Sequence, residues 1–219
     1  MEISDIINES ISIRNRLLRD KELAVHIDKC RDRIPVPKVG KGEIKLIFIG
    51  QDPTVKNKTS RDSINVVLNL GKQNSLYRYI EGIANKLGCS VEENVYATNL
   101  LKCFFVEPPA TIKGAVSRYT PYWIDLLKEE LAYYPNALII TLGEPVLNAL
   151  ITSGSKKVSK YWGYTGNTQA DIRRFNYCDA NNNLLQRIFF PFPHQPTIIN
   201  PFYSSYLDAY ISFTNNCKP

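Results

Sequence analysis

The sequence lacks the marks of several large classes of protein. Its five cysteines are scattered and form no CxxC pair, which argues against a disulfide framework and against a four-cysteine metal site. Its longest apolar runs, such as ALIITL at 137–142, fall far short of the roughly 18 residues that suggest a membrane-spanning helix. The first residues, MEISDIINES, contain no basic segment followed by an apolar one, as a secretory signal does. We therefore expect a cytoplasmic protein, associated with the nucleoid if bacterial, that does not bind membranes.

Several motifs of enzyme chemistry are also missing. The chain has no GxxxxGK[ST] loop, no GxGxxG after an apolar strand and no GxSxG elbow, so nucleotide-phosphate, dinucleotide and serine-hydrolase chemistry lack their usual signatures. There are only two histidines, and no spacing typical of metal ligands. The sequence therefore predicts a protein without metal or cofactor.

The composition is that of an ordinary globular protein. The chain has 219 residues, of which 44% are hydrophobic and 22% charged, which fits one domain rather than two. The formal net charge of +6 is compatible with a polyanionic partner but does not require one.

The order of apolar segments predicts the fold. Residues 1–43 form an N-terminal helical arm and connector, with helical pattern in two pieces over 4–31 and a connector rich in proline and glycine over 33–43. Residues 44–219 form one α/β domain. In it, strands at 44–49, 94–98, 137–142 and 187–192 alternate with helices at 75–87, 112–132, 144–152 and 202–214, and the polar segment 154–183 forms an irregular hairpin. This alternation predicts a three-layer α/β/α sandwich around a central, mainly parallel, four-stranded sheet.

Three polar side chains follow these strands at the edge where such sheets bind ligands. Asp52 comes after the first strand, Asn99 after the second, and His194 after the fourth. Each also has a structural explanation: Asp before proline shapes turns, Asn caps elements, and a histidine between prolines is more often structural than catalytic. All three fall where the fold places its ligand, which favours a shared site.

The chemistry of these residue types is coherent. Asp52 can orient or deprotonate a water molecule. Asn99 can pair with an imide or amide edge through its acceptor and donors. His194 can donate a hydrogen bond to an oxygen that becomes negative. Since no nucleophile is evident, the best chemical fit is attack by water on a bond to a good leaving anion.

The segments IFIGQDP, VYATNLLKC, IITLG and PFPHQP together resemble the uracil-DNA glycosylase superfamily, in the same order over about residues 44–214. The GQDP motif is similar to the branch without an iron–sulfur cluster. The resemblance implies a DNA-repair enzyme of base excision that hydrolyses the N-glycosidic bond of uracil or a related deaminated base. It implies that Asp52 positions the attacking water, that Gln51, Thr54 and Asn99 contact the base, and that His194 hydrogen-bonds uracil O2. Candidate DNA contacts are Lys56, Lys58, Thr197 and the wedge residue Ile198.

The chain also departs from the family's pattern. Thr54-Val55 replaces Tyr-His after GQDP, no aromatic residue occurs between Ile49 and Tyr77, and Gln195-Pro196 follows His194 in place of Pro-Ser. Cys103 stands where the cluster-bearing branch has a ligand, but the N-terminal CxxC is absent, so we expect a buried thiol and no cluster. Two alternatives stay open: a glycosylase-fold protein with little or no catalysis that binds nucleic acid or a protein, and a hydrolase of small nucleoside-like molecules. We expect a monomer that binds DNA containing a damaged base.

Overall fold

The computed structural model describes residues 2–166, 168–195 and 200–217. Its central sheet has the strand order β1-β3-β2-β4-β7. The strands are β1 (Lys38–Val39), β2 (Leu46–Gly50), β3 (Val95–Asn99), β4 (Leu138–Leu142) and β7 (Phe189–Phe192). The last four are parallel to one another, and β1 pairs with β3 in the antiparallel direction.

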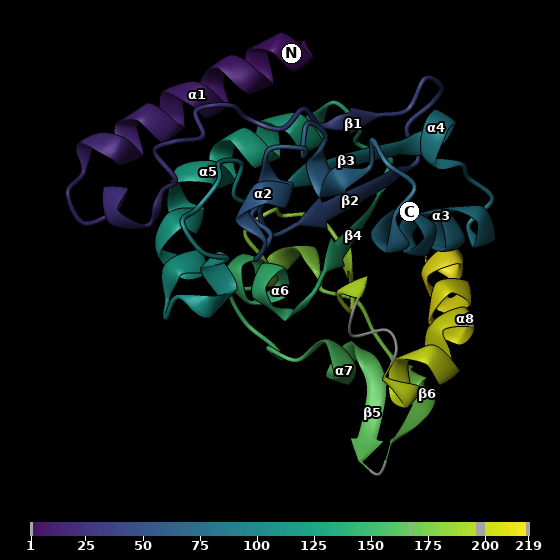
Figure 1. Ribbon diagram of the computed structural model, residues 1–219. Helices are drawn as coiled ribbons and strands as arrows, with labels where there is room; N and C mark the ends of the chain where they lie inside the picture. The colour runs from purple at the N-terminus through teal and green to yellow at the C-terminus, as the bar shows by residue number, and fades with distance from the viewer. Residues whose placement is uncertain (1, 167, 196–199, 218–219) are drawn as a thin grey trace.

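Helices cover both faces of the sheet (Figure 1), with α1, α5 and α6 on one side and α3 and α8 on the other. The α-helices are α1 (Ile3–Arg19), α2 (Lys58–Arg61), α3 (Ser75–Lys86), α4 (Val91–Asn94), α5 (Ala115–Ala132), α6 (Glu144–Leu150), α7 (Val158–Tyr161) and α8 (Pro201–Asn216). Short 3-10 turns lie at Ala24–His26, Val67–Asn69, Pro109–Thr111 and Ala180–Asn182. The predicted α/β/α sandwich with a mainly parallel sheet is confirmed.

The register of the sheet brings the strand ends together. All residues of β2, β3, β4 and β7 are buried, as expected for a parallel sheet covered on both faces. Gly50 pairs with Asn99, and Leu142 pairs with Phe192. The segments that carry Asp52, Asn99, Gly143 and His194 therefore leave the sheet along one edge.

Two local predictions are wrong. The sheet has a fifth strand, because the connector contributes β1, whose two residues pair with Ala97 and Tyr96 of β3. The second helical piece of the arm is only a turn followed by the 3-10 segment Ala24–His26. The carboxylate of Asp20 caps this turn by accepting from the backbone N–H of Glu22 at 2.9 Å, but no α-helix follows. After this segment the chain packs against the main domain, and backbone hydrogen bonds to Phe104 and Val106 take the place of helical ones.

The N-terminal arm shares the core of the main domain. Ile13, Leu17 and Ile27 belong to the same buried apolar cluster as the strands. Two backbone hydrogen bonds tie the arm to the segment after β3: Asp28 N–H donates to Phe104 at 3.0 Å, and Val106 N–H donates to His26 at 2.8 Å. The arm is therefore packed against the segment that adjoins the strand-end edge.

The predicted hairpin forms from β5 (Trp162–Gly166) and β6 (Gln169–Phe175) and lies at the bottom of Figure 1. Trp162 anchors it to the sheet and to α8. The indole N–H donates to the carbonyl of Pro191 at 2.8 Å, and the ring stacks on Tyr210 with centroids 4.4 Å apart. This places α7 and the hairpin beside β7, and therefore next to the segment that carries His194.

Candidate active site

A cavity of about 500 Å³ opens at the carboxyl edge of the sheet. Its walls are mostly apolar, with a few polar groups, which is typical of small-molecule sites. They include residues 50–56 after β2, Leu68 and Asn69, Pro108 and Ala110, Gly143 and Pro145 at the start of α6, and His194. Of the predicted site residues, Gln51, Asp52, Thr54, Lys56 and His194 therefore share one cavity.

Asp52 is the most constrained acid in this cavity. Its Oδ1 accepts from the side-chain amide of Gln51 at 2.7 Å, and its Oδ2 accepts from the backbone N–H of Thr54 at 2.7 Å. Burial raises the pKa of Asp52 to about 6, although the hydrogen bonds from Thr54 and Gln51 and the charge of Arg61 act in the opposite direction. A carboxyl group with this pKa can accept a proton near neutral pH, as a general base must.

The loop that follows Asp52 is held by buried hydrogen bonds. The hydroxyl of Thr54 accepts from the backbone N–H of Phe105 at 2.8 Å. The fully buried guanidinium of Arg61 donates from Nε to the carbonyl of Val55 at 2.7 Å, and from Nη1 to that of Phe105 at 2.9 Å. Asp28 of the arm lies 3.6 Å from the same Nη1. These contacts fix Asp52 relative to the sheet.

The ends of β2 and β3 are joined through their backbones. Leu100 N–H donates to the carbonyl of Gly50 at 2.8 Å, and Leu101 N–H donates to that of Gln51 at 2.8 Å. Lys102 Nζ donates to the backbone carbonyl of Asn99 at 3.1 Å. Lys102 in turn forms a buried ion pair with Glu130 of α5. The main chain of Asn99 is thus firmly positioned.

The side chain of Asn99, unlike its main chain, is not held by hydrogen bonds to the residues that the structure describes. The residue is 1% exposed, and neither its amide nitrogen nor its amide oxygen has a hydrogen-bond partner among the described residues. The described wall of the cavity includes Leu68 and Gly50 but not Asn99. Asn99 therefore lies at the predicted edge without reaching the cavity.

His194 lines the same cavity as the β2 loop and lies against Gly143. A Cβ on Gly143 would lie 3.3 Å from the Cβ of His194, and Gly143 has a φ of +90°, so a side chain at this position would be both crowded and strained. Although much of His194 is solvent-exposed, partial burial lowers its pKa below the ordinary 6.5. The imidazole is therefore neutral at pH 7 and can donate one hydrogen bond.

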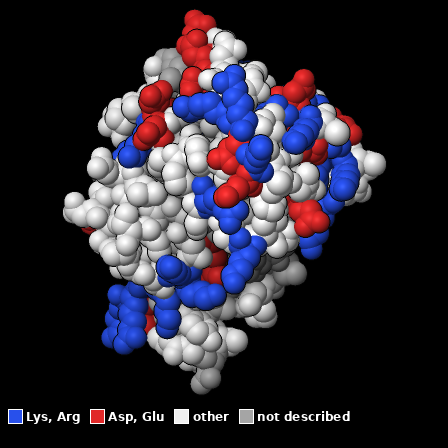
Figure 2. Space-filling model, turned by 90° about the vertical axis from the view of Figure 1, so that its left-hand side faces the viewer, with Lys and Arg blue, Asp and Glu red and all other residues white. Residues whose placement is uncertain are grey.

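A basic flank adjoins the His194 side of the cavity. It consists of the exposed residues Lys156, Lys157, Lys160, Arg173 and Arg174 on α7, β6 and the segment before α7. Figure 2 shows Lys and Arg gathered in the lower part of the molecule, at the height of α7 and the hairpin, whereas both signs mix over the upper part. Lys157 pairs with Glu144 at 3.1 Å, which links the flank to the start of α6. Lys56, which lines the cavity, and the nearby Lys58 of α2 are also exposed.

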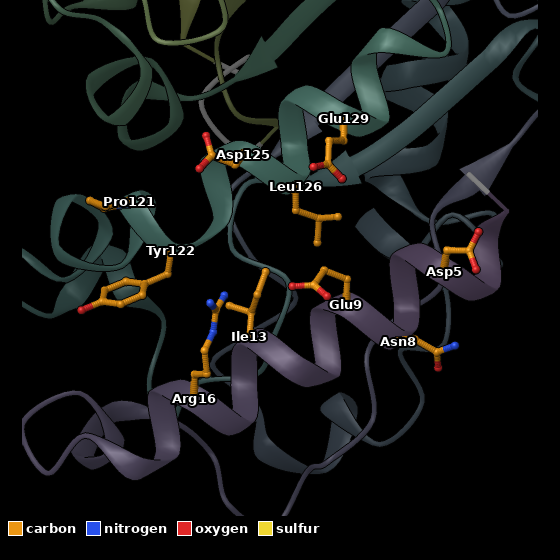
Figure 3. Close-up of a pocket in the computed structure, with 10 residues that line it drawn as sticks. All are labelled: Asp5, Asn8, Glu9, Ile13, Arg16, Pro121, Tyr122, Asp125, Leu126 and Glu129. Atoms are coloured by element: carbon orange, nitrogen blue, oxygen red, sulfur yellow. The ribbon is translucent and has the colours of Figure 1, made fainter.

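A second cavity, of about 650 Å³, lies between α1 and α5 and is shown in Figure 3. Ile13 and Leu126 face each other across it. Four carboxylates and one guanidinium surround them: Asp5, Glu9, Asp125, Glu129 and Arg16. Their net negative charge disfavours phosphate, and none of the predicted site residues is present.

The remaining predictions concern the thiol of Cys103, metal binding, membrane spans and the residues after His194. Cys103 is fully buried, and burial raises the pKa of its thiol to about 12, so it is a protonated thiol as expected. Within the described ranges, no cluster of three or more His, Cys, Asp or Glu is arranged to hold a metal ion, and no helix is long and apolar enough to cross a membrane. Thr197 and Ile198 lie outside the described residues.

Sequence reasoning missed two residues that shape the cavity. Arg61 has no motif around it, and only its burial and its backbone acceptors reveal its role. Leu68 occupies the left-handed region at φ 55°, which a leucine in an unremarkable VLNLG segment does not signal. Only the neighbouring Asn69 and Gly71 are residues typical of turns.

Comparison with curated protein sequences gives no significant match. The model of the uracil DNA glycosylase superfamily, by contrast, matches residues 37–209, a range that contains the whole central sheet and every residue of the strand-end edge. A match to this superfamily implies glycosylase-type function with DNA as the substrate. On the sequence match and the fold together, the chain belongs to the uracil DNA glycosylase superfamily.

Proposed function

We propose that this protein is a DNA base-excision glycosylase that hydrolyses the N-glycosidic bond of uracil or a related deaminated base. The observation that carries the proposal is the state of Asp52. Its carboxyl group is oriented by Gln51 and Thr54, has a pKa of about 6, and faces the same cavity as His194. Membership in the superfamily indicates that the bond to be hydrolysed is the N-glycosidic bond of a nucleotide in DNA.

The proposed reaction assigns one role to each group. Asp52 orients a water molecule toward the sugar C1′ carbon and accepts a proton from it as the new C–O bond forms. The C1′–N bond breaks, and its electron pair leaves with the base. His194, neutral at pH 7, donates a hydrogen bond to the base oxygen on which negative charge develops. The products are the free base and an abasic site.

Access to the cavity requires the base to leave the duplex stack, at a cost of a few kcal/mol. The exposed Lys56 and Lys58 on one side, and the basic flank on the other, are proposed to bind the phosphates that lie beside the flipped nucleotide. Thr197 as a phosphate contact and Ile198 as the wedge also remain proposals, as do Gln51, Thr54 and Asn99 as contacts of the base.

One observation favours a second candidate, a glycosylase-fold protein that binds nucleic acid or a protein without catalysis. The amide of Asn99 does not reach the cavity. The side chain that is proposed to read the edge of the base is thus withdrawn from the cavity in this conformation. Binding to DNA with no base release from any damaged substrate would select this candidate.

The test is release of the base from oligonucleotides that carry uracil, hypoxanthine, xanthine or a thymine mismatch, followed by alkaline cleavage of abasic sites. We expect one or more substrates to be cleaved, and Asp52→Asn and His194→Ala to lower the rate by about 10²–10⁴-fold while DNA binding persists. Asp125→Asn, an exposed acid of the α1–α5 cavity, and His26→Ala, in the arm, are the matched controls. Unchanged turnover in both site variants would contradict the mechanism.

A further inference from the structure

The side-chain amide of Asn99 is a buried polar group that has no hydrogen-bond partner in the part of the chain that the structure describes. Both its nitrogen and its oxygen lie out of solvent, and the residue is 1% exposed. Buried polar groups in native proteins are nearly always paired, so an unpaired amide needs an explanation. Its main chain gives none, because β3 and the contact from Lys102 hold it in place.

Leu68 lies where a partner of this amide would be. A Cβ placed on Gly50 would lie 2.3 Å from Cδ2 of Leu68 and 2.6 Å from Oδ1 of Asn99. The leucine methyl group and the amide oxygen thus lie next to each other, on the same side of Gly50. Since Leu68 forms part of the cavity wall and Asn99 does not, the leucine side chain separates the amide from the cavity.

The backbone that carries Leu68 is strained. Leu68 has φ 55° and Asn69 has φ 52°, so two consecutive residues with a Cβ adopt the left-handed conformation. Such conformations cost free energy and persist only where the surroundings enforce them. Here both ends are tied: Val67 N–H donates to Val36 at 2.9 Å, and the side-chain amide of Asn74 donates to the carbonyl of Asn69 at 2.9 Å. Leu68 lies between these two ties, and its side chain is only partly buried.

We propose that Leu68 is a gate between the cavity and Asn99, and that an entering base must displace it before Asn99 can pair with the base edge. This inference rests on the proposed function only in taking an unpaired nucleobase as the ligand. A base with adjacent N–H and C=O groups would satisfy both orphaned atoms of Asn99, which compensates for moving the leucine. A base without that edge would displace Leu68 and gain no such pair. Leu68 is therefore a specificity-determining residue.

The experiment measures the Asn99 side-chain amide directly, by its proton exchange with water in ¹⁵N-labelled full-length protein, with Asn99→Asp to assign the signal. We expect Leu68→Ala to increase the exchange rate at least tenfold and to tighten binding of free uracil at least tenfold. The gain in uracil binding should disappear in the double variant Leu68→Ala/Asn99→Ala. Leu76→Ala, which shortens another leucine of the same cavity, should leave the exchange rate unchanged.

Leu68→Gly is the second variant, because glycine adopts this backbone conformation without strain if the alanine protein folds poorly. Exchange that is unchanged in both Leu68 variants, or raised equally by Leu76→Ala, would overturn the gate. These readouts do not depend on catalysis. If the wild type releases the base but the Leu68 variants leave Asn99 amide exchange unaltered, the gate alone is refuted. If the Leu68 variants expose the Asn99 amide but the wild type releases no base, the glycosylase proposal is refuted and the gate stands.

Discussion

The two halves of the strand-end edge differ in how completely their polar groups are bound. At the end of β2, both oxygens of Asp52 accept hydrogen bonds, and the loop behind it is fixed by Thr54 and Arg61. At the end of β3, where Asn99 pairs with Gly50 of β2, the side-chain amide of Asn99 has no hydrogen-bond partner among the described residues. The first half is organised without a ligand, and the second is not.

This difference separates positioning from recognition. A group that handles a water molecule must hold one geometry, since small displacements cost much of the rate. A group that reads a ligand gains its hydrogen bonds only when the ligand arrives, so leaving it unpaired makes binding depend on the correct partner. We infer that the β2 end carries the chemistry and the β3 end carries the selection.

The largest expected effect comes from breaking the organised half. Arg61→Met removes a buried charge that serves three backbone carbonyls and lies beside Asp28. The substitution leaves those carbonyls without their donor and removes one of the two guanidinium groups beside Asp28, which keeps its hydrogen bond from Arg31. We expect the free energy of unfolding to fall by about 3–5 kcal/mol, measured by urea denaturation.

The exposed Arg118 of α5 provides the matched control for this substitution. Arg118→Met should change stability by less than about 0.5 kcal/mol. If Arg61→Met were equally harmless, the network behind Asp52 would not be what holds the loop.

A much smaller effect on stability is expected in the other half. Asn99→Ala removes two buried polar atoms that have no partner among residues 2–166, 168–195 and 200–217, and this gain offsets the cost of the small cavity that is left. We expect the free energy of unfolding to change by less than about 1 kcal/mol, while binding of a free base weakens. A large loss of stability, measured in the same urea titration, would mean that the Asn99 amide is paired in solution and that the contrast between the halves is false.

Much of the molecule follows from the sequence because its signals are local. Four apolar runs predict the parallel strands, and the helix predicted at 75–87 forms as α3, with Asn74 as its N-cap. The strand-end rule then brought Asp52 and His194 to one cavity without any knowledge of side-chain packing. Periodicity and topology are sufficient for this much.

The remaining features depend on contacts between distant segments. The strand β1 forms only because β3 offers a free edge to the connector, and its two residues carry no strand pattern of their own. The end of the arm folds against Phe104 and Val106 instead of continuing as a helix. Leu68 separates Asn99 from the cavity through a backbone conformation that leucine propensities disfavour. None of these can be read from a window of sequence.

The central claim is that the ionised carboxylate of Asp52 handles the attacking water, and the pH dependence of base release tests it most directly. Single-turnover release from a uracil oligonucleotide should be measured from pH 5 to pH 8 for the wild type, Asp52→Asn and the Asp125→Asn control. Because the reaction needs the deprotonated form and the pKa of Asp52 is about 6, the wild-type rate should fall as pH drops below 6 and level off toward pH 8. His194 is neutral over the upper part of this range. Asp52→Asn should be slow and lack this inflection. A wild-type rate that is flat across pH 6, or the same inflection in Asp52→Asn, would contradict the account.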